Sequence, residues 1–455
     1  MFQASKITPE MLEDEGSWDP VVLCGPMYRL LASQPIGSLD TWGARVVDGS
    51  RGSEKPMVTA TQIVFGELSL DTDSLLPAPN VSRYRLETGD VLLGKAPPIR
   101  AAWICPSVHH HHFDATCYAV RNLKTSQGIW LAFCLNQPEY SSALVRRSVA
   151  SASPRINSTE LKRFAIPDIP EGFELLADGI ADCLDRRALS SMELLRLQAE
   201  VAEQVGVLVP EEASRIQDEG SGPSSWSQWF AASALEDSLV PGHVKAGEYQ
   251  QVLRHRADWR TVNSLIHLAR GDGRRLGSEA SEYRCLRHSD VGNDLRVPAL
   301  VSRGRSGYRN VYAEPLESGE VLHSLLATSP RTVFVAQRPE PRVYPTDHWV
   351  RLRFTETPGA WALTMQTEPI ARQLRYMATG IARQFATISA VEQLVLPPVP
   401  ISIRQSWDSR LVRWQRQRKE LDGQWLELVD RVHGLLKATE SLYGPWVETF
   451  LRSDE

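Results

Sequence analysis

The tract between Cys105 and Cys117 holds the side chains best suited to metal chemistry. Its two thiols flank four successive histidines, from His109 to His112. Thiolate and imidazole are the ligands that zinc prefers in proteins. However, successive side chains of an extended chain point to opposite faces, the spacing matches no standard zinc module, and the tract occurs only once. The pattern therefore favours a polar surface loop, and we expect no metal.

No other motif is typical of a catalytic site. The sequence has no phosphate loop, no Gly-rich dinucleotide loop, no Gly-x-Ser-x-Gly elbow and no HExxH. Its Pro-Pro pairs, at Pro97 and Pro397, lack the preceding Asp or Asn that amino-methyltransferases place there. We therefore expect no cofactor and no catalytic residue in this chain.

Arginines gather in two stretches, although the chain as a whole carries a net charge of −5. Residues 143–163 hold five cations against one carboxylate, and residues 251–275 hold six arginines against two carboxylates. The planar guanidinium suits phosphates and guanine edges, and binding depends on where charge lies rather than on its sum. The two stretches fit nucleic-acid contact, and they fit solvated faces of ordinary domains equally well.

The composition is typical of a soluble globular protein. At 455 residues, with 42% apolar and 23% charged side chains, the chain is long enough for two domains and their connectors. Its apolar runs are too short to cross a bilayer, and the N-terminus does not resemble a secretion leader. The cysteines lack paired spacing, which fits reduced thiols. We expect a cytoplasmic protein.

The sequence repeats itself about 230 residues later. Residues 89–93 (GDVLL) return as 319–323 (GEVLH), and the stretch 156–170 returns as 388–400. The two landmarks lie the same distance apart in each copy, and a long segment with helical periodicity follows each copy. The chain therefore consists of a globular unit and a helix, each present twice.

The C-terminal helical segment carries a heptad seam, in which apolar residues alternate at steps of four and three. The seam is formed by Trp407, Leu411, Trp414, Arg418, Leu421, Trp425, Leu428, Val432 and Leu435. A strict seam indicates a partner helix, because packing on a domain surface needs only a broad apolar stripe. Its tryptophans indicate contacts beyond a two-helix zipper.

The central helical segment, from Phe173 to about Val205, is the intramolecular candidate for that partner. It presents apolar residues at helical spacing, namely Ile180, Leu184, Leu194 and Val201. We therefore expect the two segments to form an antiparallel coiled coil, with the seam residues either packed inside it or facing a partner protein.

These patterns predict an α+β fold. It consists of two similar mixed α/β domains, separated by long helices in an antiparallel coiled coil and related by a pseudo-twofold internal repeat. The expected segments are a first domain at 1–170, a central spacer helix at 171–208, a flexible linker at 209–225, a second domain at 226–400, and a C-terminal spacer helix with a tail at 401–455.

The order of these landmarks resembles the specificity subunit of type I restriction-modification enzymes, across essentially the whole chain. The likeness is carried in the first copy by 47–49 (VDG), 59–68 (TATQIVFGEL), 84–93 (YRLETGDVLL), 130–139 (WLAFCLNQPE) and 153–167, and in the second by 319–322, 367–369 (TEP) and 388–400. The chain departs from the family at 94–100 (GKAPPIR) and 324–331 (SLLATSPR), where the family has a small Gly-rich turn.

The resemblance implies a non-catalytic DNA reader. Each domain would be a target-recognition domain that contacts one half of a split double-stranded DNA target. The coiled coil would set the spacing and dock two methyltransferase subunits, with restriction or translocase subunits as further partners. About 33 helical residues span roughly 50 Å, the length of about 15 base pairs, which suits a split site with an unread spacer.

For contact with bases or phosphates we select cations near the repeated landmarks. In the first domain these are Lys95, Arg100, Arg146, Arg147 and Arg155, and in the second Arg303, Arg305, Arg309, Arg331 and Arg338. Two alternatives stay open. One is a scaffold of another phage-defence or DNA-modification system that kept the fold without reading sequence. The other is a self-contained DNA-modifying enzyme with a cryptic site near the His tract.

Overall fold

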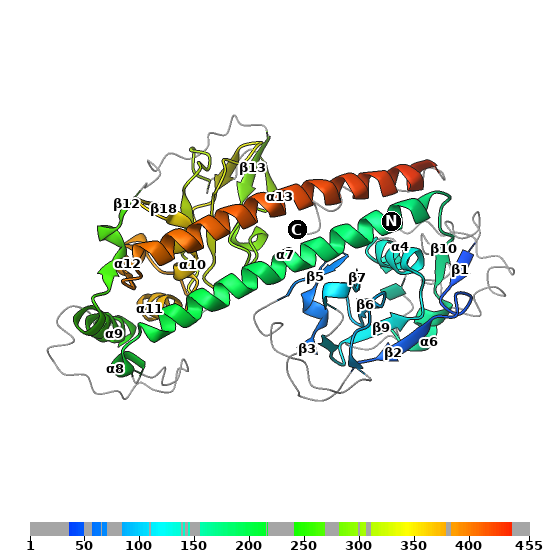
Figure 1. Cartoon of the computed structure of the whole chain (residues 1–455), viewed down its shortest axis with the longest axis horizontal. Helices are drawn as coiled ribbons and strands as arrows, with labels where there is room; N and C mark the ends of the chain where they lie inside the picture. Colours follow the sequence, from blue (N-terminus) through cyan, green and yellow to red (C-terminus); the bar gives the residue numbers. More distant parts are fainter. Residues whose placement is uncertain are drawn as a thin grey trace, which may run out of the picture. The chain divides into compact units, whose positions relative to one another are not determined.

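The computed structural model describes residues 36–49, 57–64, 66–70, 84–108, 111–137, 140–141, 144–145, 155–214, 216, 241–268, 282–298, 301–305, 311–378 and 384–438. The chain divides into two compact units, each assembled from separate stretches of sequence. Unit 1 comprises 1–195 and 420–446, and unit 2 comprises 196–419 and 447–455. Figure 1 shows the elements of both units.

The globular part of unit 1 mixes short strands with helices. Its elements are β1 (Ile36–Ser38), β2 (Arg45–Asp48), β3 (Met57–Val58), η1 (Ala60–Gln62), β4 (Ile63–Val64), β5 (Glu67–Leu68), β6 (Val91–Gly94), β7 (Ala101–Trp103), η4 (Pro106–Val108), β8 (His112–Phe113), β9 (Cys117–Arg121), α4 (Thr125–Leu135), α6 (Ser158–Arg163) and β10 (Ala165–Pro167).

A four-stranded antiparallel sheet in the order β2-β9-β6-β7 lies at the centre of unit 1. Helix α4 packs on β6 and β7, and it is buried over most of its length because its residues are almost all apolar. The long helix α7 (Phe173–Val207) lies beyond α4, where the rings of Trp130 and Phe173 meet edge to face at 5.1 Å. The core of unit 1 is therefore layered as sheet, buried helix and long helix.

Unit 2 follows the same plan with additional elements. They are α8 (Glu211–Ser214), α9 (Pro241–Ala257), β11 (Arg260–Thr261), η6 (Val262–Ser264), β12 (Ile266–Leu268), β13 (Glu282–Leu286), η7 (His288–Asp290), β14 (Ser302–Arg305), β15 (Val321–Ser324), β16 (Thr332–Phe334), β17 (Val343–Pro345), β18 (Trp349–Phe354), α10 (Pro358–Met365), α11 (Glu368–Met377), α12 (Ile388–Gln393), β19 (Val395–Leu396) and α13 (Ile401–Ala438).

The sheet of unit 2 has the order β12-β18-β15-β16, which is the order of unit 1 element for element. Helix α10 packs on β15 and β16 as α4 packs on β6 and β7. The helices before the long ones are capped alike, since Asn157 accepts a bond from the Glu160 N–H and Thr387 accepts one from the Ala390 N–H. The predicted internal repeat is confirmed at the level of sheet topology and caps.

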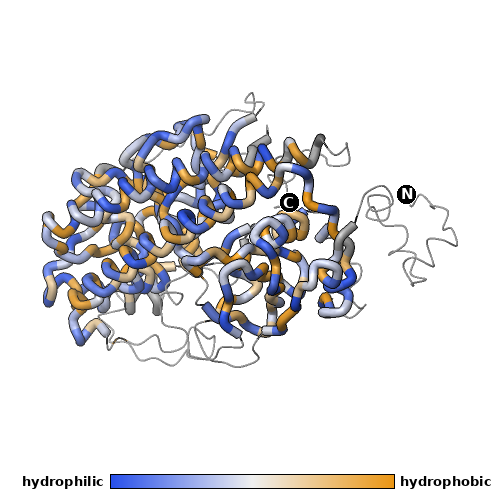
Figure 2. The backbone as a smooth tube through the Cα atoms, turned by 45° about the vertical axis from the view of Figure 1, so that its right-hand side comes forward, coloured by the Kyte–Doolittle hydropathy of each residue, from blue (hydrophilic) through white to orange (hydrophobic). Residues whose placement is uncertain are grey.

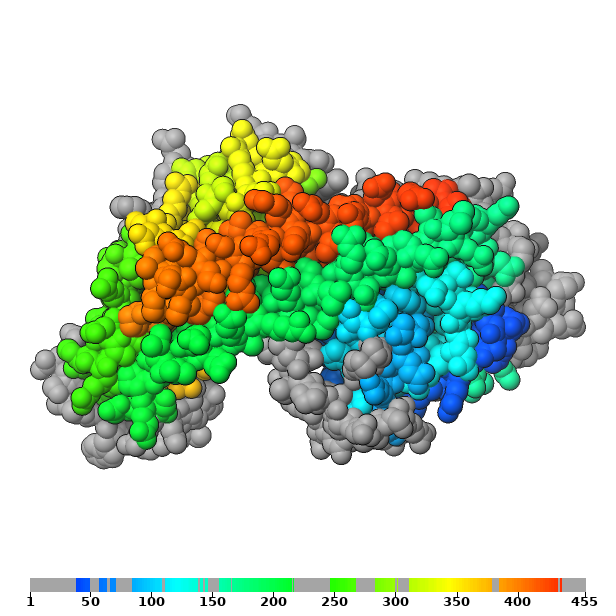
Figure 3. All heavy atoms as spheres, in the orientation of Figure 1, coloured from blue at the N-terminus to red at the C-terminus, as the bar shows by residue number. Residues whose placement is uncertain are grey.

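The long helices α7 and α13 contain 35 and 38 residues and show alternating apolar and polar positions along their length (Figure 2). They run antiparallel, because Arg187 contacts Asp422 in unit 1, whereas Glu200, farther along α7, contacts the earlier residue Arg410 in unit 2. Figure 3 shows the two helices in contact through their side chains. The predicted antiparallel helix pair is confirmed.

The seam residues of α13 face the protein interior. Trp407, Leu411, Trp414, Arg418, Leu421 and Val432 are buried, and Trp425, Leu428 and Leu435 are partly buried against the core of unit 1. On α7, Ile180, Leu184, Leu194 and Val201 are buried. One contact beyond the helix pair is made by Trp425, whose ring lies 6.0 Å from the ring of Phe133 on α4.

The segment predicted as a flexible linker, 209–225, contains a short helix near its start. Residues 211–214 form α8, in which Ala213 is fully buried and donates its N–H to Pro210 O. Residues 217–225 lie outside the described ranges. No helix in the described part of the chain has both the length and the apolar character that a membrane span requires.

Candidate nucleic-acid interface

A buried carboxylate anchors the turn that precedes the inner strand β6 of unit 1. Gly89 takes a positive φ of 90°, and the Asp90 side chain accepts the Glu87 N–H at 2.8 Å and the Arg121 Nε at 3.2 Å. Burial raises the pKa of Asp90 to about 6, although Arg121 and the Glu87 N–H oppose the rise. This turn fixes where β6 begins and where β9 ends.

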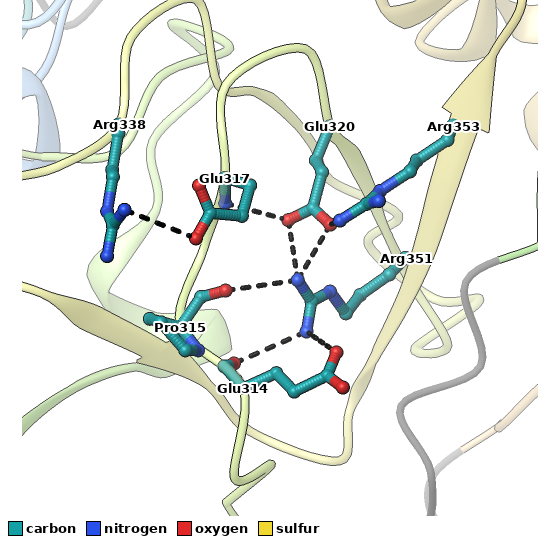
Figure 4. A network of polar contacts seen from close by, with 7 residues as sticks. All are labelled: Glu314, Pro315, Glu317, Glu320, Arg338, Arg351 and Arg353. Atoms are coloured by element: carbon teal, nitrogen blue, oxygen red, sulfur yellow. Dashed lines mark hydrogen bonds and ion pairs between the residues drawn. The ribbon is translucent and has the colours of Figure 1, made fainter.

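The equivalent turn of unit 2 carries a larger charge network, shown in Figure 4. Glu320 is fully buried and accepts bonds from Arg351 at 2.7 Å and from Arg353 at 2.8 Å. It also accepts the Glu317 N–H at 3.0 Å, and the Glu317 carboxylate lies 3.6 Å from Arg338. Arg338, selected from the sequence for DNA contact, thus lies at the solvent edge of this network with 40% of its side chain exposed.

The end of the β6–β7 hairpin in unit 1 brings three of the selected cations together. The Gly94 N–H donates to Arg100 O at 3.1 Å, and the Ile156 N–H donates to Lys95 O at 2.9 Å. The second bond places Arg155, the residue before Ile156, beside the hairpin end. We call this arrangement of the hairpin end and the segment before α6 the hairpin junction.

Lys95 is held inside the hairpin junction. Its ammonium donates to Asp48 and to Ala115 O at 2.8 Å, and it lies 4.3 Å from the centre of the Tyr118 ring. Only 8% of the residue is exposed. A lysine that is buried, paired and packed on a ring stabilises the junction through these contacts.

Arg100 and Arg155 are both exposed at the hairpin junction. They flank the hydrogen bond between Lys95 and Ile156, one after the hairpin and one before α6. An exposed guanidinium can form two parallel bonds to a phosphate or to a guanine edge. The hairpin junction of unit 1 therefore carries two exposed guanidinium groups, a chemistry that suits phosphates and guanine edges.

Unit 2 forms the same junction from different side chains. The Ser324 N–H donates to Arg331 O at 2.9 Å, and the Ala386 N–H donates to Leu325 O at 2.8 Å. These bonds are the counterparts of the two that define the junction of unit 1, so Arg331 corresponds to Arg100 and Leu325 to Lys95. Phe385 takes the position of Arg155.

Arg331 turns inward, unlike its counterpart Arg100. Its Nη1 donates to His288 O at 2.7 Å and to Val291 O. Burial lowers its pKa, but the guanidinium stays protonated at neutral pH. In this position Arg331 holds the η7 segment against the hairpin.

Rings take the place of cations at the surface of the unit 2 junction. The His288 ring stacks on Trp349 with centroids 5.9 Å apart, and the His348 ring lies 5.8 Å from the Phe385 ring. Burial lowers the pKa of His288, which favours the neutral imidazole at pH 7. The neutral His288 imidazole and the Phe385 ring suit stacking better than binding to a phosphate.

The remaining selected cations are placed only in part. Arg303 and Arg305 lie on β14, which is antiparallel to β13. In this pair Arg303 lies opposite Arg284, and Arg305 lies opposite Glu282. Arg146, Arg147 and Arg309 lie outside the described ranges. The assignment of all ten cations to DNA contact stays a prediction.

The Cys–His tract is placed in part. Cys105 and Cys117 are buried, and burial raises the pKa of each thiol to about 12, which disfavours the thiolate that binds a metal. His112 on β8 is 2% exposed, so this part of the tract is not the surface loop that the sequence predicts. His109 and His110 lie outside the described ranges, and no group of three or more metal-ligating side chains occurs among the residues described.

Sequence reasoning missed the rings of the second junction. His288, His348 and Phe385 carry no charge run and match no motif. The sequence matched position 156 with 388, whereas the backbone bonds match Ile156 with Ala386. Phe385 could have been found by applying to Arg155 the offset of 230 that relates residues 89–93 to 319–323. His288 could not, since it becomes part of the junction only through its contacts with Arg331 and Trp349.

No protein-family model matches the chain, and no curated protein matches it. Among solved structures, the S subunit of a type I restriction-modification system from M. genitalium is 10% identical, with 90% of this chain and 96% of that chain covered and a TM-score of 0.33. The HsdS subunit from Thermoanaerobacter tengcongensis is 14% identical, with 87% and 96% covered and a TM-score of 0.23. A structure described as showing assembly and conformational transition of the type I R-M system gives the same values. These are proteins of the kind that the sequence landmarks resemble.

Proposed function

We propose that this chain is a non-catalytic DNA-recognition subunit that reads a split double-stranded target and serves a methyltransferase. Residues 1–170 and 226–400 would form its two recognition domains. Helical segments within 171–208 and 401–455 would carry them and dock two methyltransferase subunits. Restriction or translocase subunits are further candidate partners.

The observation that carries this proposal is the repetition of one architecture on two long helices. The sheet order, the buried carboxylate before the inner strand, and the two backbone bonds of the hairpin junction all recur. A protein that reads two separated half-sites needs two domains of one kind at a fixed separation. A repeat of this kind has no comparable use in an enzyme with a single cryptic site.

The chemistry of the hairpin junctions supports a nucleic acid as the ligand, and its difference between the two units supports half-sites of different sequence. Arg100 and Arg155 offer exposed guanidinium groups in unit 1. His348 and Phe385 offer rings in unit 2. Cations contribute affinity through phosphates and rings contribute selectivity through base contacts, so the two junctions would make different contributions to one complex.

The test is to co-express the chain with its methyltransferase subunit in a host that lacks both, and to map methylated bases across the genome. The expected result is a split motif that depends on the chain. Exchange of residues 1–170 for the matching residues of a related subunit should change one half of the motif only. Methylation that is independent of this chain would reject the proposal and favour the scaffold alternative. Methylation or cleavage by the purified chain alone would favour the enzyme alternative.

A further inference from the structure

One side chain of α13 joins the long helix to the globular part of unit 2 through three backbone bonds. Gln415 Oε1 accepts the Ala336 N–H at 3.3 Å, and Gln415 Nε2 donates to Phe334 O at 3.0 Å and to Leu295 O at 2.9 Å. These carbonyl and amide groups belong to the end of β16 and to the segment after η7. The amide group of one side chain thus holds two loops of the domain on the helix.

Unit 1 has a carboxylate at the matching position of α7. The two long helices start alike, since the Phe173 N–H donates to Pro170 O and the Ile403 N–H donates to Pro400 O. Counting from these starts, Gln415 corresponds to Asp185. Asp185 Oδ1 accepts the Ser107 N–H at 2.8 Å, just after β7, and it also accepts a bond from the Cys105 thiol.

A second side chain completes the joint in unit 1, one half-turn along the same helix. Arg187 donates to both carboxylate oxygens of Glu67, at 2.9 and 2.8 Å, and to Asp422 on α13. Beside it, Gly66 lies next to the Trp425 ring, at a distance where an added Cβ would make an ordinary van der Waals contact of 3.5 Å with it. Glu67 belongs to β5, in the globular part of unit 1. Arg187, which lies on α7, therefore connects this globular part to both long helices.

We infer that Gln415 in unit 2, and Asp185 with Arg187 in unit 1, are positioning residues that fix each recognition domain on its helix and thereby restrict the target to one spacer length. We call these three residues the domain clasp. The inference rests on the proposed function, and it identifies the side chains that determine how far the spacer between the half-sites can vary in length. Helices α7 and α13 are each continuous, so their length alone sets no angle for the domains. The clasp sets that angle, because its bonds hold two separate segments of each domain on the helix, beside edge strand β7 in unit 1 and at the end of edge strand β16 in unit 2.

The first test measures the joint without DNA. Hydrogen exchange would be followed in the purified chain and in Gln415→Ala, Arg187→Gln and Asp185→Ala. Backbone amides of β16 or of β5 and η4 should exchange about tenfold faster or more in the variants, while the sheet strands β6 and β15 stay protected. The matched controls are Gln417→Ala and Arg186→Gln, which change exposed residues of the same helices. Unchanged exchange in all three clasp variants would overturn the inference.

The second test measures spacer tolerance in the methylation map. In clasp variants the half-site sequences should persist, while methylation at sites whose spacer differs by one base pair should rise about tenfold over the parent chain. Asp185→Asn keeps an acceptor oxygen and should retain the parent spacer, whereas Asp185→Ala should not. An unchanged spacer in Gln415→Ala and Arg187→Gln would overturn the inference. If the parent chain directs no split motif, the proposed function fails, and the exchange measurement still decides whether the clasp holds the domains.

Discussion

Arg187 of α7 and Asp422 of α13 form an ion pair in which each side chain is only 8% exposed. Burial opposes the charged guanidinium, but the attraction of Glu67 and Asp422 outweighs it and raises the pKa of Arg187. The arginine is therefore charged at every pH at which the protein is folded. Its partners matter because the loss of either one removes a charged hydrogen-bond acceptor from a buried guanidinium group.

Loss of this pair should destabilise unit 1. We expect Asp422→Asn to lower the free energy of unfolding by about 2 kcal/mol, because it removes one charged acceptor from Arg187 while Glu67 still neutralises the guanidinium group. Chemical unfolding at neutral pH checks the value. Glu420→Gln changes an exposed carboxylate two residues earlier and should have an effect below about 0.5 kcal/mol. Equal effects of the two substitutions would contradict the buried pairing.

His323 should make unit 2 sensitive to acid. It is fully buried, and burial lowers its pKa from 6.5 to about 4. The folded state therefore binds fewer protons than the unfolded state between these values, and stability falls as pH falls through that window. His323→Leu places there the residue that Leu93 provides at the matching strand position of unit 1. Between pH 6.5 and 4 the free energy of unfolding should fall less in this variant than in the parent chain, by up to about 3 kcal/mol, as measured by urea unfolding. If the free energy of unfolding changed with pH in the same way in both proteins, the buried His323 imidazole would not be neutral in the folded state as proposed.

Asp90 should produce a pH dependence of the opposite sign. Burial raises its pKa from 3.8 to about 6, so its contribution to stability is full below pH 3.8 and declines as pH rises to 6. Asp90→Asn removes this titration. As pH rises from 4 to 6, the free energy of unfolding of the variant should therefore increase by about 2–3 kcal/mol relative to that of the parent chain. Thermal unfolding over that range provides the measurement. A constant difference between the two proteins would show that Asp90 titrates normally.

Arg100 and Arg331 occupy matching positions but should respond differently to substitution. Arg100→Ala should leave stability within about 0.5 kcal/mol and reduce the slope of log affinity against log salt for duplex DNA by about one. Arg331→Ala should instead cost about 1–3 kcal/mol of stability, because it leaves the carbonyls of His288 and Val291 without their donor. Unfolding curves and salt titrations on both variants separate the effects. Arg186→Ala on α7 is the exposed control for the salt slope.

The repeated turns could be predicted from sequence because their residue types are dictated locally. A backbone with positive φ needs glycine, and both Gly89 and Gly319 adopt one. The acidic residue that follows each glycine caps a backbone N–H three residues earlier. The heptad seam was equally readable, since a period of seven residues determines which face of a helix is buried.

The surface chemistry was harder to predict, because a cation in a sequence carries no sign of what lies opposite it. Lys95 is neutralised by Asp48, whose position beside it depends on the pairing of β2 with β9 and of β9 with β6. Arg331 is bound by carbonyls of η7, about 40 residues earlier in the chain. Lys95 and Arg331 thus have internal partners that only the folded chain brings near.

The assembly of unit 1 from the two ends of the chain has a consequence during synthesis on the ribosome. Trp425 and Val432 complete the core around α4, yet they are translated roughly 220 residues after the last residue of α7, Val207. Until they arrive, the apolar face that includes Phe133 stays open to water or to a chaperone. A ribosome that stops early would release a chain whose first unit lacks part of its core.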